Sequence, residues 1–213
     1  MNSIAVVDYG MGNLRSVAKA LEHVAPDARI VVTSDAGEIA RADRVVFPGV
    51  GAMPDCIREL EARGLRQVLV EAAQTKPFLG ICLGMQALFE FSEEGHVAGL
   101  GVLPGKVRLF PREAMHDTQG QRLKVPHIGW NEVNQAVPHP LWNGITNGAR
   151  FYFVHSYYVE AGDPELVAAF THYPFAFACA VARNNIFAVQ FHPEKSQAAG
   201  LKLLANFAEW QPA

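Results

Sequence analysis

Short apolar runs alternate with amphipathic segments through the first ninety residues of this chain. The runs have the length of buried strands, and the segments between them space apolar residues three and four apart, as helices do. Strands that alternate with helices predict a parallel sheet covered by helices on both faces. The expected strands are 4–7, 29–33, 44–47 and 78–82, and the expected helices are 14–24, 37–41, 54–73 and 85–90.

The second half of the chain is richer in β-forming residues, separated by Pro, Gly and Asn. Asn184-Asn185 is a suitable hairpin turn. We therefore predict a single domain, residues 1–213, of the α/β class, with a mixed, mainly parallel sheet flanked by helices. The further strands are expected at 107–110, 125–133, 151–159, 166–170, 175–182 and 186–191, with a surface excursion at 112–124 and a helix at 197–210.

Composition excludes several classes of function. A formal net charge of −3 offers no basic patch for nucleic acid. No apolar run has membrane-spanning length, and the N-terminus lacks the features of a signal peptide. The three cysteines are too scattered for a disulfide framework and fit a reducing compartment, so we expect a cytoplasmic protein.

Cys82 lies between two glycines, Gly80 and Gly84, directly after a predicted strand. A nucleophile on a tight strand-to-helix turn needs small neighbours, because the backbone bends sharply there. A helix N-terminus beside the sulfur would favour the thiolate, and the N–H of Leu83 would be free to donate to an oxyanion. A buried, inert cysteine is the alternative, and this turn alone does not decide between the two.

His192 and Glu194 follow another apolar strand and are separated only by Pro193. In extended chain, residues two apart point to the same side, and Pro193 favours that conformation for His192. A carboxylate can orient an imidazole, which can in turn activate a thiol. By itself the pair also fits a solvated loop. Together with Cys82, at the carboxyl ends of parallel strands, it favours a catalytic site.

The stretch Pro48-Gly49-Val50-Gly51 ends a third strand. Its glycines allow the backbone to approach a ligand and to turn an N–H inward, which indicates a second oxyanion donor. A simple turn between strand and helix is the alternative. Gly10-Met-Gly12 lacks the full dinucleotide pattern, so we expect no cofactor, and no metal site is predicted.

These motifs together resemble the class I (triad) glutamine amidotransferases, over residues 4–210. The stretch 80–86 is similar to that family's nucleophile turn, and 190–194 to its His/Glu pair. Segments 8–14, 48–51, 127–131 and 152–157 are similar to the glutaminase subunits of histidine biosynthesis. The fold of that family is a mixed sheet flanked by helices.

The resemblance implies a mechanism. Cys82 would attack the side-chain amide of glutamine to form a thioester, with His192 as acid and base and Glu194 holding the imidazole. The N–H groups of Leu83 and Val50 would meet the oxyanion. The residues implied in substrate binding are Gly49, Gly51, Gln86, His155, Ser156 and Tyr157. Cys56 and Cys179 have no such surroundings and are expected in the core.

The resemblance also implies a partner, because the chain offers no second site that would use ammonia. We expect a heterodimer with a cyclase (synthase) subunit that makes imidazole glycerol phosphate and an aminoimidazole carboxamide ribonucleotide. The candidates for the partner interface are Asn13, His127, Trp130, Asn131 and Lys195. Three alternatives stay open: a glutaminase subunit of another pathway, a free-standing cysteine hydrolase, and a non-catalytic binding module.

Overall fold

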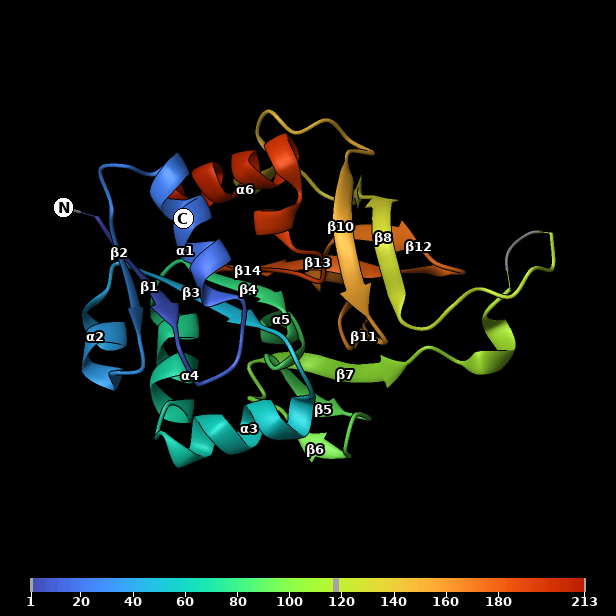
Figure 1. Ribbon diagram of the computed structural model, residues 1–213, viewed down its shortest axis with the longest axis horizontal. Helices are drawn as coiled ribbons and strands as arrows, with labels where there is room; N and C mark the ends of the chain where they lie inside the picture. Colours follow the sequence, from blue (N-terminus) through green and yellow to red (C-terminus); the bar gives the residue numbers. More distant parts are fainter. Residues whose placement is uncertain (1, 117–118, 213) are drawn as a thin grey trace.

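A mixed sheet forms the centre of the molecule in the computed structural model, which describes residues 2–116 and 119–212 (Figure 1). Its strands lie in the order β2-β1-β3-β4-β14-β13-β11-β7-β5-β6, and the predicted mixed α/β sheet is confirmed. The parallel part consists of β1 (Ser3–Val7), β2 (Arg29–Thr33), β3 (Arg44–Gly49), β4 (Phe78–Cys82) and β14 (Ile186–Val189).

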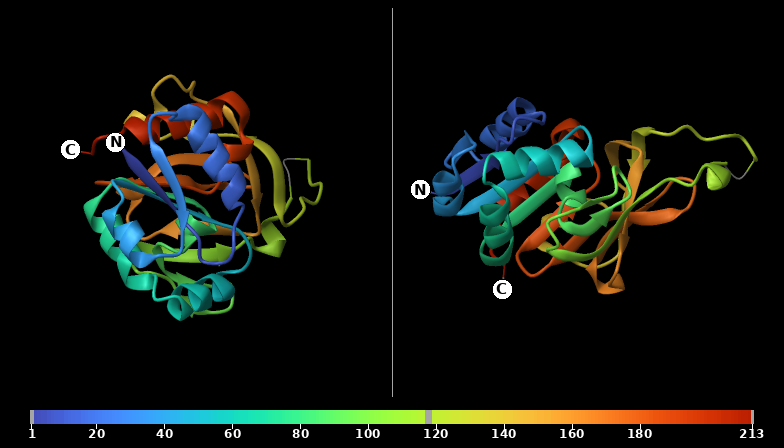
Figure 2. Two further views of the ribbon diagram at one scale, coloured as in Figure 1. Left: turned by 60° about the vertical axis from the view of Figure 1, so that its left-hand side comes forward. Right: turned by 90° about the horizontal axis from the view of Figure 1, so that it is seen from below.

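Helices cover both faces of this parallel part, as the strand–helix alternation predicts (Figure 2). One face carries α1 (Leu14–Val24) and α6 (Gln197–Glu209); the other carries α2 (Ala36–Arg41), α3 (Met53–Ala62) and α4 (Arg66–Thr75). Alternate residues of each strand enter the two cores: in β1, Ile4 and Val6 pack beneath α1, and Ala5 and Val7 pack on the opposite face. Each buried Val or Ile contributes about 1.5–3 kcal/mol.

A mostly antiparallel part, in which only β5 and β7 pair in parallel among the described strands, extends the sheet beyond β14. It contains β5 (Phe89–Ser92), β6 (Val97–Ala98), β7 (Leu103–Leu109), β9 (Asn134–Gln135), β11 (Tyr157–Ala161), β12 (Val167–His172) and β13 (Ala176–Arg183). Asn184 at φ +53° makes the predicted turn between β13 and β14. The segment after β7 projects from the body of the molecule, and residues 117 and 118 of the expected excursion lie outside the described residues.

The helix predicted at 54–73 is wrong in one respect, because two helices occupy that segment. Gly64 adopts φ +66°, a left-handed conformation that ends α3. The chain then turns, buries Leu65, and begins α4 at Arg66. Apolar periodicity continues through both helices, so the pattern does not reveal the break.

The helix predicted at 85–90 is also wrong. The turn after Cys82 opens only one helical turn, α5 (Leu83–Gln86), and Phe89 already lies in β5. Phe89 is fully buried and pairs with Leu103 of β7. Tertiary pairing therefore outweighs the local helical preference of this segment.

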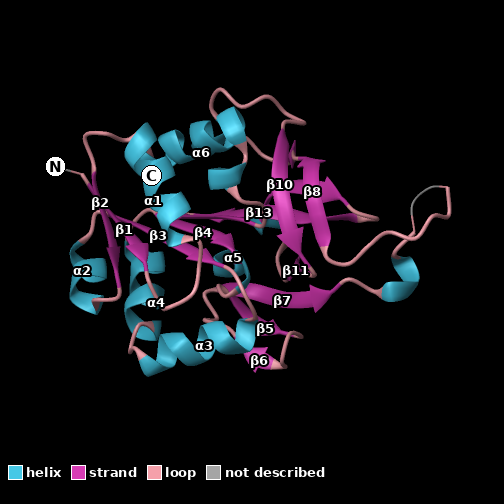
Figure 3. Ribbon diagram, viewed as in Figure 1, coloured by secondary structure: helices cyan, strands magenta, loops and turns pink. Residues whose placement is uncertain are grey.

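The strand predicted at 151–159 divides at Ser156. Its first part is β10 (Arg150–His155), which pairs with β8 (His127–Glu132) in a separate two-stranded sheet; its second part is β11, in the main sheet (Figure 3). The break brings the residues around Ser156 to the edge of a cavity above β4. None of the described helices is long and apolar enough to span a membrane.

Candidate active site

Cys82 occupies a strained turn at the end of β4. Its φ of +55° and ψ of −110° are rare for a residue with a side chain, and such strain is typical of functional positions. The glycines make the turn possible: a Cβ at Gly84 would collide with the carbonyl oxygen of Phe47, and one at Gly80 would lie 3.0 Å from the oxygen of Gly84. The sequence pattern thus has a steric cause.

Cys82 is largely buried, at 7% exposure of the residue. It can donate to the carbonyl oxygen of Val154, 3.9 Å away, and it accepts from the side-chain nitrogen of Gln190 at 3.5 Å. The expected helix dipole is small, because α5 has only four residues. The carbonyl group of Val154 and the side-chain amide of Gln190 are therefore polar neighbours of the sulfur in place of a long helix N-terminus.

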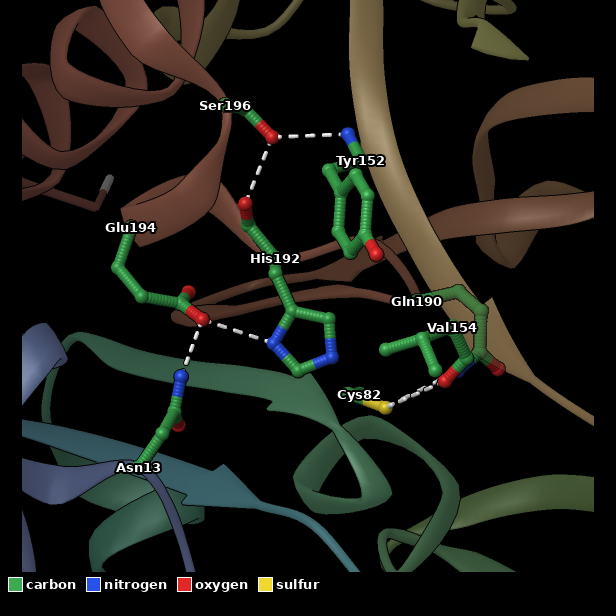
Figure 4. Close-up of polar contacts among 8 residues, drawn as sticks. All are labelled: Asn13, Cys82, Tyr152, Val154, Gln190, His192, Glu194 and Ser196. Carbon is green, nitrogen blue, oxygen red and sulfur yellow. Dashed lines mark hydrogen bonds and ion pairs between the residues drawn. The ribbon is translucent and has the colours of Figure 1, made fainter. Parts of the chain in front are cut away.

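His192 and Glu194 are in direct contact, although not through the extended chain expected from the sequence. His192 is extended, but Glu194 lies in a 3₁₀ turn, Pro193–Lys195. That turn brings Oε1 of Glu194 to 2.8 Å from Nδ1 of His192, with both side chains buried. Nδ1–H therefore donates to the carboxylate, which leaves Nε2 to face Cys82 (Figure 4).

The charge state of His192 follows from these neighbours. Burial alone would lower the pKa of the imidazole, but contacts with Cys82 and Glu194 outweigh burial and raise that pKa to about 9. Among the described residues, Nε2 of His192 has no hydrogen-bond partner. It is therefore available to exchange a proton with a group in the cavity.

Two further residues hold the His192–Glu194 pair in place. The side-chain amide of Asn13, a residue expected at the partner interface, donates to Oε1 of the buried Glu194 carboxylate. Ser196 donates to the carbonyl oxygen of His192 at 2.6 Å and accepts from the N–H of Tyr152 at 3.0 Å. Both the ring and the backbone of His192 are thus fixed.

A cavity of about 290 Å³ opens beside Cys82 and His192. Its lining includes these residues that the sequence predicts for the oxyanion and substrate sites: Val50, Gly51, Leu83, Gln86, His155, Ser156 and Tyr157. Gly49 is the exception. It is buried and paired with Cys82 across β3 and β4, and a Cβ there would lie 2.7 Å from the hydroxyl of Tyr9, which is a steric reason for a glycine at this position.

Sequence reasoning missed Glu94, Pro126 and Val154, which also line the cavity. Glu94 accepts from the N–H of Met53 at 2.8 Å, and burial raises the pKa of its carboxyl. It follows β5 in a loop with no motif, so no local signal marks it. Among the described residues, no cluster of His, Cys, Asp and Glu is arranged for a metal ion.

The expected partner-interface residues differ in exposure. Trp130 is 43% exposed and Lys195 is exposed, whereas His127 is buried. The ring of His127 stacks on Phe153 and Tyr173, with centroids 5.0 and 4.0 Å away, so its assignment to the partner face is corrected. Asn131, half-buried, donates to the carbonyl oxygen of His172 at 3.1 Å.

His127 belongs instead to a buried histidine pair with His155. Nδ1 of His127 lies 2.9 Å from Nε2 of His155, and Nδ1–H of His155 donates to the carbonyl oxygen of Tyr157 at 2.7 Å. Burial lowers the pKa of His127 to about 4 and that of His155 to about 3. Both rings are neutral at pH 7, and each donates from Nδ1.

Comparison with known proteins identifies the family of this chain. Residues 5–210 match the family model for glutamine amidotransferase class-I. The imidazole glycerol phosphate synthase subunit HisH of Thiobacillus denitrificans is 68% identical, over 98% of this chain and 92% of that protein. The subunit of the same name from Nitrosospira multiformis is 64% identical over the full length of both.

Solved structures support the fold. A putative GMP synthase subunit from Thermoplasma acidophilum has a TM-score of 0.70 at 20% identity, covering 98% of this chain and 93% of that one. PurLQS from Thermotoga maritima also has a TM-score of 0.70, at 19% identity and 98% coverage of both chains.

Proposed function

The chain belongs to the class-I glutamine amidotransferase family, and from that premise we propose that it is the glutaminase subunit of an imidazole glycerol phosphate synthase in histidine biosynthesis. Full-length identity of 64–68% to subunits of that name supports the pathway. The observation that carries the chemistry is the placement of Cys82 and the His192–Glu194 pair at one cavity.

Glutamine would bind in the 290 Å³ cavity with its side-chain amide at Cys82. Its α-ammonium group needs acceptors and negative charge, and Glu94 and the side-chain oxygen of Gln86 supply them at the cavity wall. His155, Ser156 and Tyr157 also line the cavity. Recognition at both ends of the substrate holds the amide carbon against the sulfur.

The thiol proton of Cys82 resides on Nε2 of His192, whose raised pKa favours the imidazolium, and the reaction begins when the thiolate attacks the amide carbon. The tetrahedral intermediate then expels ammonia, which takes its proton from the imidazolium and leaves a γ-glutamyl thioester. His192 next takes a proton from water, which attacks the thioester; the C–S bond breaks, glutamate is released, and Cys82 leaves as the thiolate beside protonated His192. Glu194 holds the Nδ1–H tautomer throughout, because it accepts that proton's hydrogen bond at 2.8 Å.

The negative oxygen of the intermediate requires N–H donors. Leu83 is the first residue of α5, where the backbone N–H has no partner within the helix. Val50 lines the same cavity from the end of β3. We assign the oxyanion site to these two N–H groups, and loss of one such donor costs about two to three orders of magnitude in rate.

Ammonia would pass to a cyclase subunit in a heterodimer, with the chain acting as a single domain in the cytoplasm. The exposed apolar side chains of Trp130 and Ile128, at 43% and 58%, give β8 a face that fits a protein partner. Lys195 lies near this face, with its amine 6.0 Å from the ring of Tyr152. Asn13 would connect the interface to Glu194.

Ammonia release from glutamine tests the proposal. It is measured for the wild type and for Cys82→Ala, each with and without the cyclase subunit. We expect release by the wild-type complex only, and a covalent adduct of a glutamine-analogue electrophile at Cys82. Absence of release under every condition would refute the proposal.

The remaining alternatives give different results in the same assay. A free-standing cysteine hydrolase would reach its full rate without a partner, and a non-catalytic module would form no adduct. A glutaminase of another pathway would bind a different synthase in a pull-down experiment.

A further inference from the structure

A row of buried amides connects the backbone of β11 to the sulfur of Cys82. The side-chain nitrogen of Gln86 donates to the carbonyl oxygen of Tyr157 at 3.1 Å and to the side-chain oxygen of Gln190 at 2.9 Å. The side-chain nitrogen of Gln190 in turn donates to the sulfur at 3.5 Å. Gln190 is fully buried and Gln86 is 5% exposed.

The direction of this row is fixed at the Tyr157 end. A backbone carbonyl only accepts hydrogen bonds, so Gln86 must present its NH₂ group there. Both hydrogens of that group are then used, one on Tyr157 and one on Gln190. Gln190 therefore turns its oxygen toward Gln86 and its NH₂ group toward Cys82. His155 also donates a hydrogen bond to the carbonyl oxygen of Tyr157, at 2.7 Å, and so holds this carbonyl group in place.

An N–H donor at the sulfur favours the thiolate, because a charged acceptor forms a stronger hydrogen bond than a neutral thiol. This contribution matters here since α5 is too short to supply a large helix dipole. The same donor also restricts where the sulfur can lie. The thiolate would therefore remain aligned with the amide carbon of a substrate.

The side-chain oxygen of Gln190 accepts a hydrogen bond from Gln86 and so affects the orientation of the Gln86 amide. Since the donors of Gln86 are occupied, the group that it can offer to the cavity is its oxygen, an acceptor. An acceptor beside the carboxylate of Glu94 selects a ligand with a cationic donor, such as an α-ammonium group. Without Gln190, the amide of Gln86 could reverse and present a donor instead.

We propose that Gln190 is a positioning residue that serves both nucleophile and substrate recognition: its amide nitrogen holds the Cys82 thiolate, and its amide oxygen fixes the orientation of Gln86. The inference rests on the proposed glutaminase function, in which glutamine is the substrate.

Two variants separate the two tasks. Gln190→Met keeps the length of the side chain but removes both the donor and the acceptor. Gln190→Glu keeps an oxygen for Gln86 and replaces the donor at the sulfur by a carboxylate. Thr171→Val is the matched control, because Thr171 is a fully buried residue of β12 whose hydroxyl has no hydrogen-bond partner within the described part of the chain.

The first readout is the pH midpoint of iodoacetamide alkylation at Cys82, which does not depend on glutamine. Cys56 and Cys179 are fully buried. Burial raises the pKa of Cys56 to about 12 and also raises the pKa of Cys179, so neither thiol should be alkylated. Cys82→Ala provides the blank. We expect the midpoint to rise by about one pH unit in Gln190→Met, the effect of losing one hydrogen bond to a charge. Gln190→Glu should raise it further.

The second readout is glutaminase kinetics in the complex with the cyclase subunit. Gln190→Met should lower kcat about tenfold and raise KM about tenfold, since each loss removes about one hydrogen bond. Gln190→Glu should lower kcat at least as much while KM stays within about threefold of wild type, because the acceptor for Gln86 remains. Thr171→Val should change neither constant.

The outcomes distinguish the two proposals. If the wild-type complex releases no ammonia, the glutaminase function fails, while alkylation still reports on Gln190. If the wild type is active and Gln190→Met keeps the wild-type midpoint, kcat and KM, the positioning role is overturned. Should Gln190→Met not fold, an unchanged midpoint in folded Gln190→Glu would overturn it equally.

Discussion

Asn13 and His192 both donate to the same oxygen of Glu194, although Asn13 lies 181 residues before that carboxylate in the chain. The loop after the first strand thus completes a constellation whose other members come from the ends of β4 and β14 (Figure 4). Because the other oxygen of Glu194 has no partner among the described residues, this shared oxygen fixes the orientation of the carboxylate.

Asn13→Ala should therefore lower kcat by about ten- to hundredfold, the equivalent of one hydrogen bond to a buried charge. The reason is that Glu194 could then rotate and release Nδ1 of His192. Ammonia release by the complex measures the effect. Arg15→Ala, an exposed change on the first turn of α1, is the control. A wild-type kcat in Asn13→Ala would show that His192 alone holds the carboxylate.

Glu194→Gln should lower the rate by about two to four orders of magnitude, because it removes the charge that supports protonated His192. The pKa of His192 is raised to about 9, partly by this carboxylate, so the variant should titrate at lower pH. Proton NMR of the imidazole measures the shift. An unchanged pKa in the variant would assign the whole elevation to Cys82.

The sign of the stability effect follows from the same shift. A histidine whose folded pKa lies above its unfolded value of about 6.5 stabilises the fold below that value. This contribution is lost as pH rises through about 9. In Glu194→Gln, the free energy of unfolding should therefore differ less between pH 6 and pH 10 than in the wild type. Denaturation at these two pH values measures the difference.

Much of this site could be predicted because its signals are local. Glycine is required on both sides of Cys82 because a Cβ there would come too close to other atoms. At Gly80 the nearest atom belongs to the turn itself, and at Gly84 it is the carbonyl oxygen of Phe47, which lies farther away in the sequence. The proximity of His192 and Glu194 follows from their spacing, although a 3₁₀ turn rather than an extended strand produces it. Short sequence separation makes such features visible before folding is known.

The features that escaped prediction depend on distant partners. Phe89 lies in a strand and not in the expected helix because it pairs with β7. His127 is buried because Tyr173 stacks on it from another part of the chain. Glu94 enters the cavity from a loop whose position depends on the N–H of Met53. None of these contacts has a periodic pattern or a motif in the sequence.

The buried pair His127–His155 predicts acid instability. Their folded pKa values of about 4 and about 3 lie below the unfolded value of about 6.5, so the unfolded chain binds more protons between these limits. Stability should therefore fall as pH decreases from about 6.5 toward 4, by up to about 1.4 kcal/mol per pH unit for each ring.

Urea denaturation between pH 4 and pH 8 measures this dependence. His155→Gln, which keeps a donor and an acceptor, should flatten the curve, whereas His23→Gln at an exposed position of α1 should leave it unchanged. Equal slopes for wild type and His155→Gln would contradict the assignment.

Gly84→Ala should distort the backbone of the turn that holds Cys82. The added Cβ would collide with the carbonyl oxygen of Phe47, which belongs to β3 and cannot move without breaking its pairing with β4. Overpacking of this kind costs about 1–3 kcal/mol of stability. Because Cys82 lies two residues earlier, its sulfur should shift away from His192, and ammonia release should fall more than the folded fraction does.

Gly64→Ala separates backbone strain from this collision. Gly64 has φ +66°, and an added Cβ would meet no heavy atom within 4 Å, so its variant bears only the strain of a left-handed backbone with a side chain, at a cost of about 1–2 kcal/mol. Its kcat should remain that of wild type, since the turn between α3 and α4 lies outside the cavity lining. Comparing kcat at equal folded fraction in the two variants isolates the geometric requirement at Cys82. Equal kcat values would mean that the turn tolerates displacement and that the contacts of the sulfur with Val154 and Gln190 are sufficient to hold it.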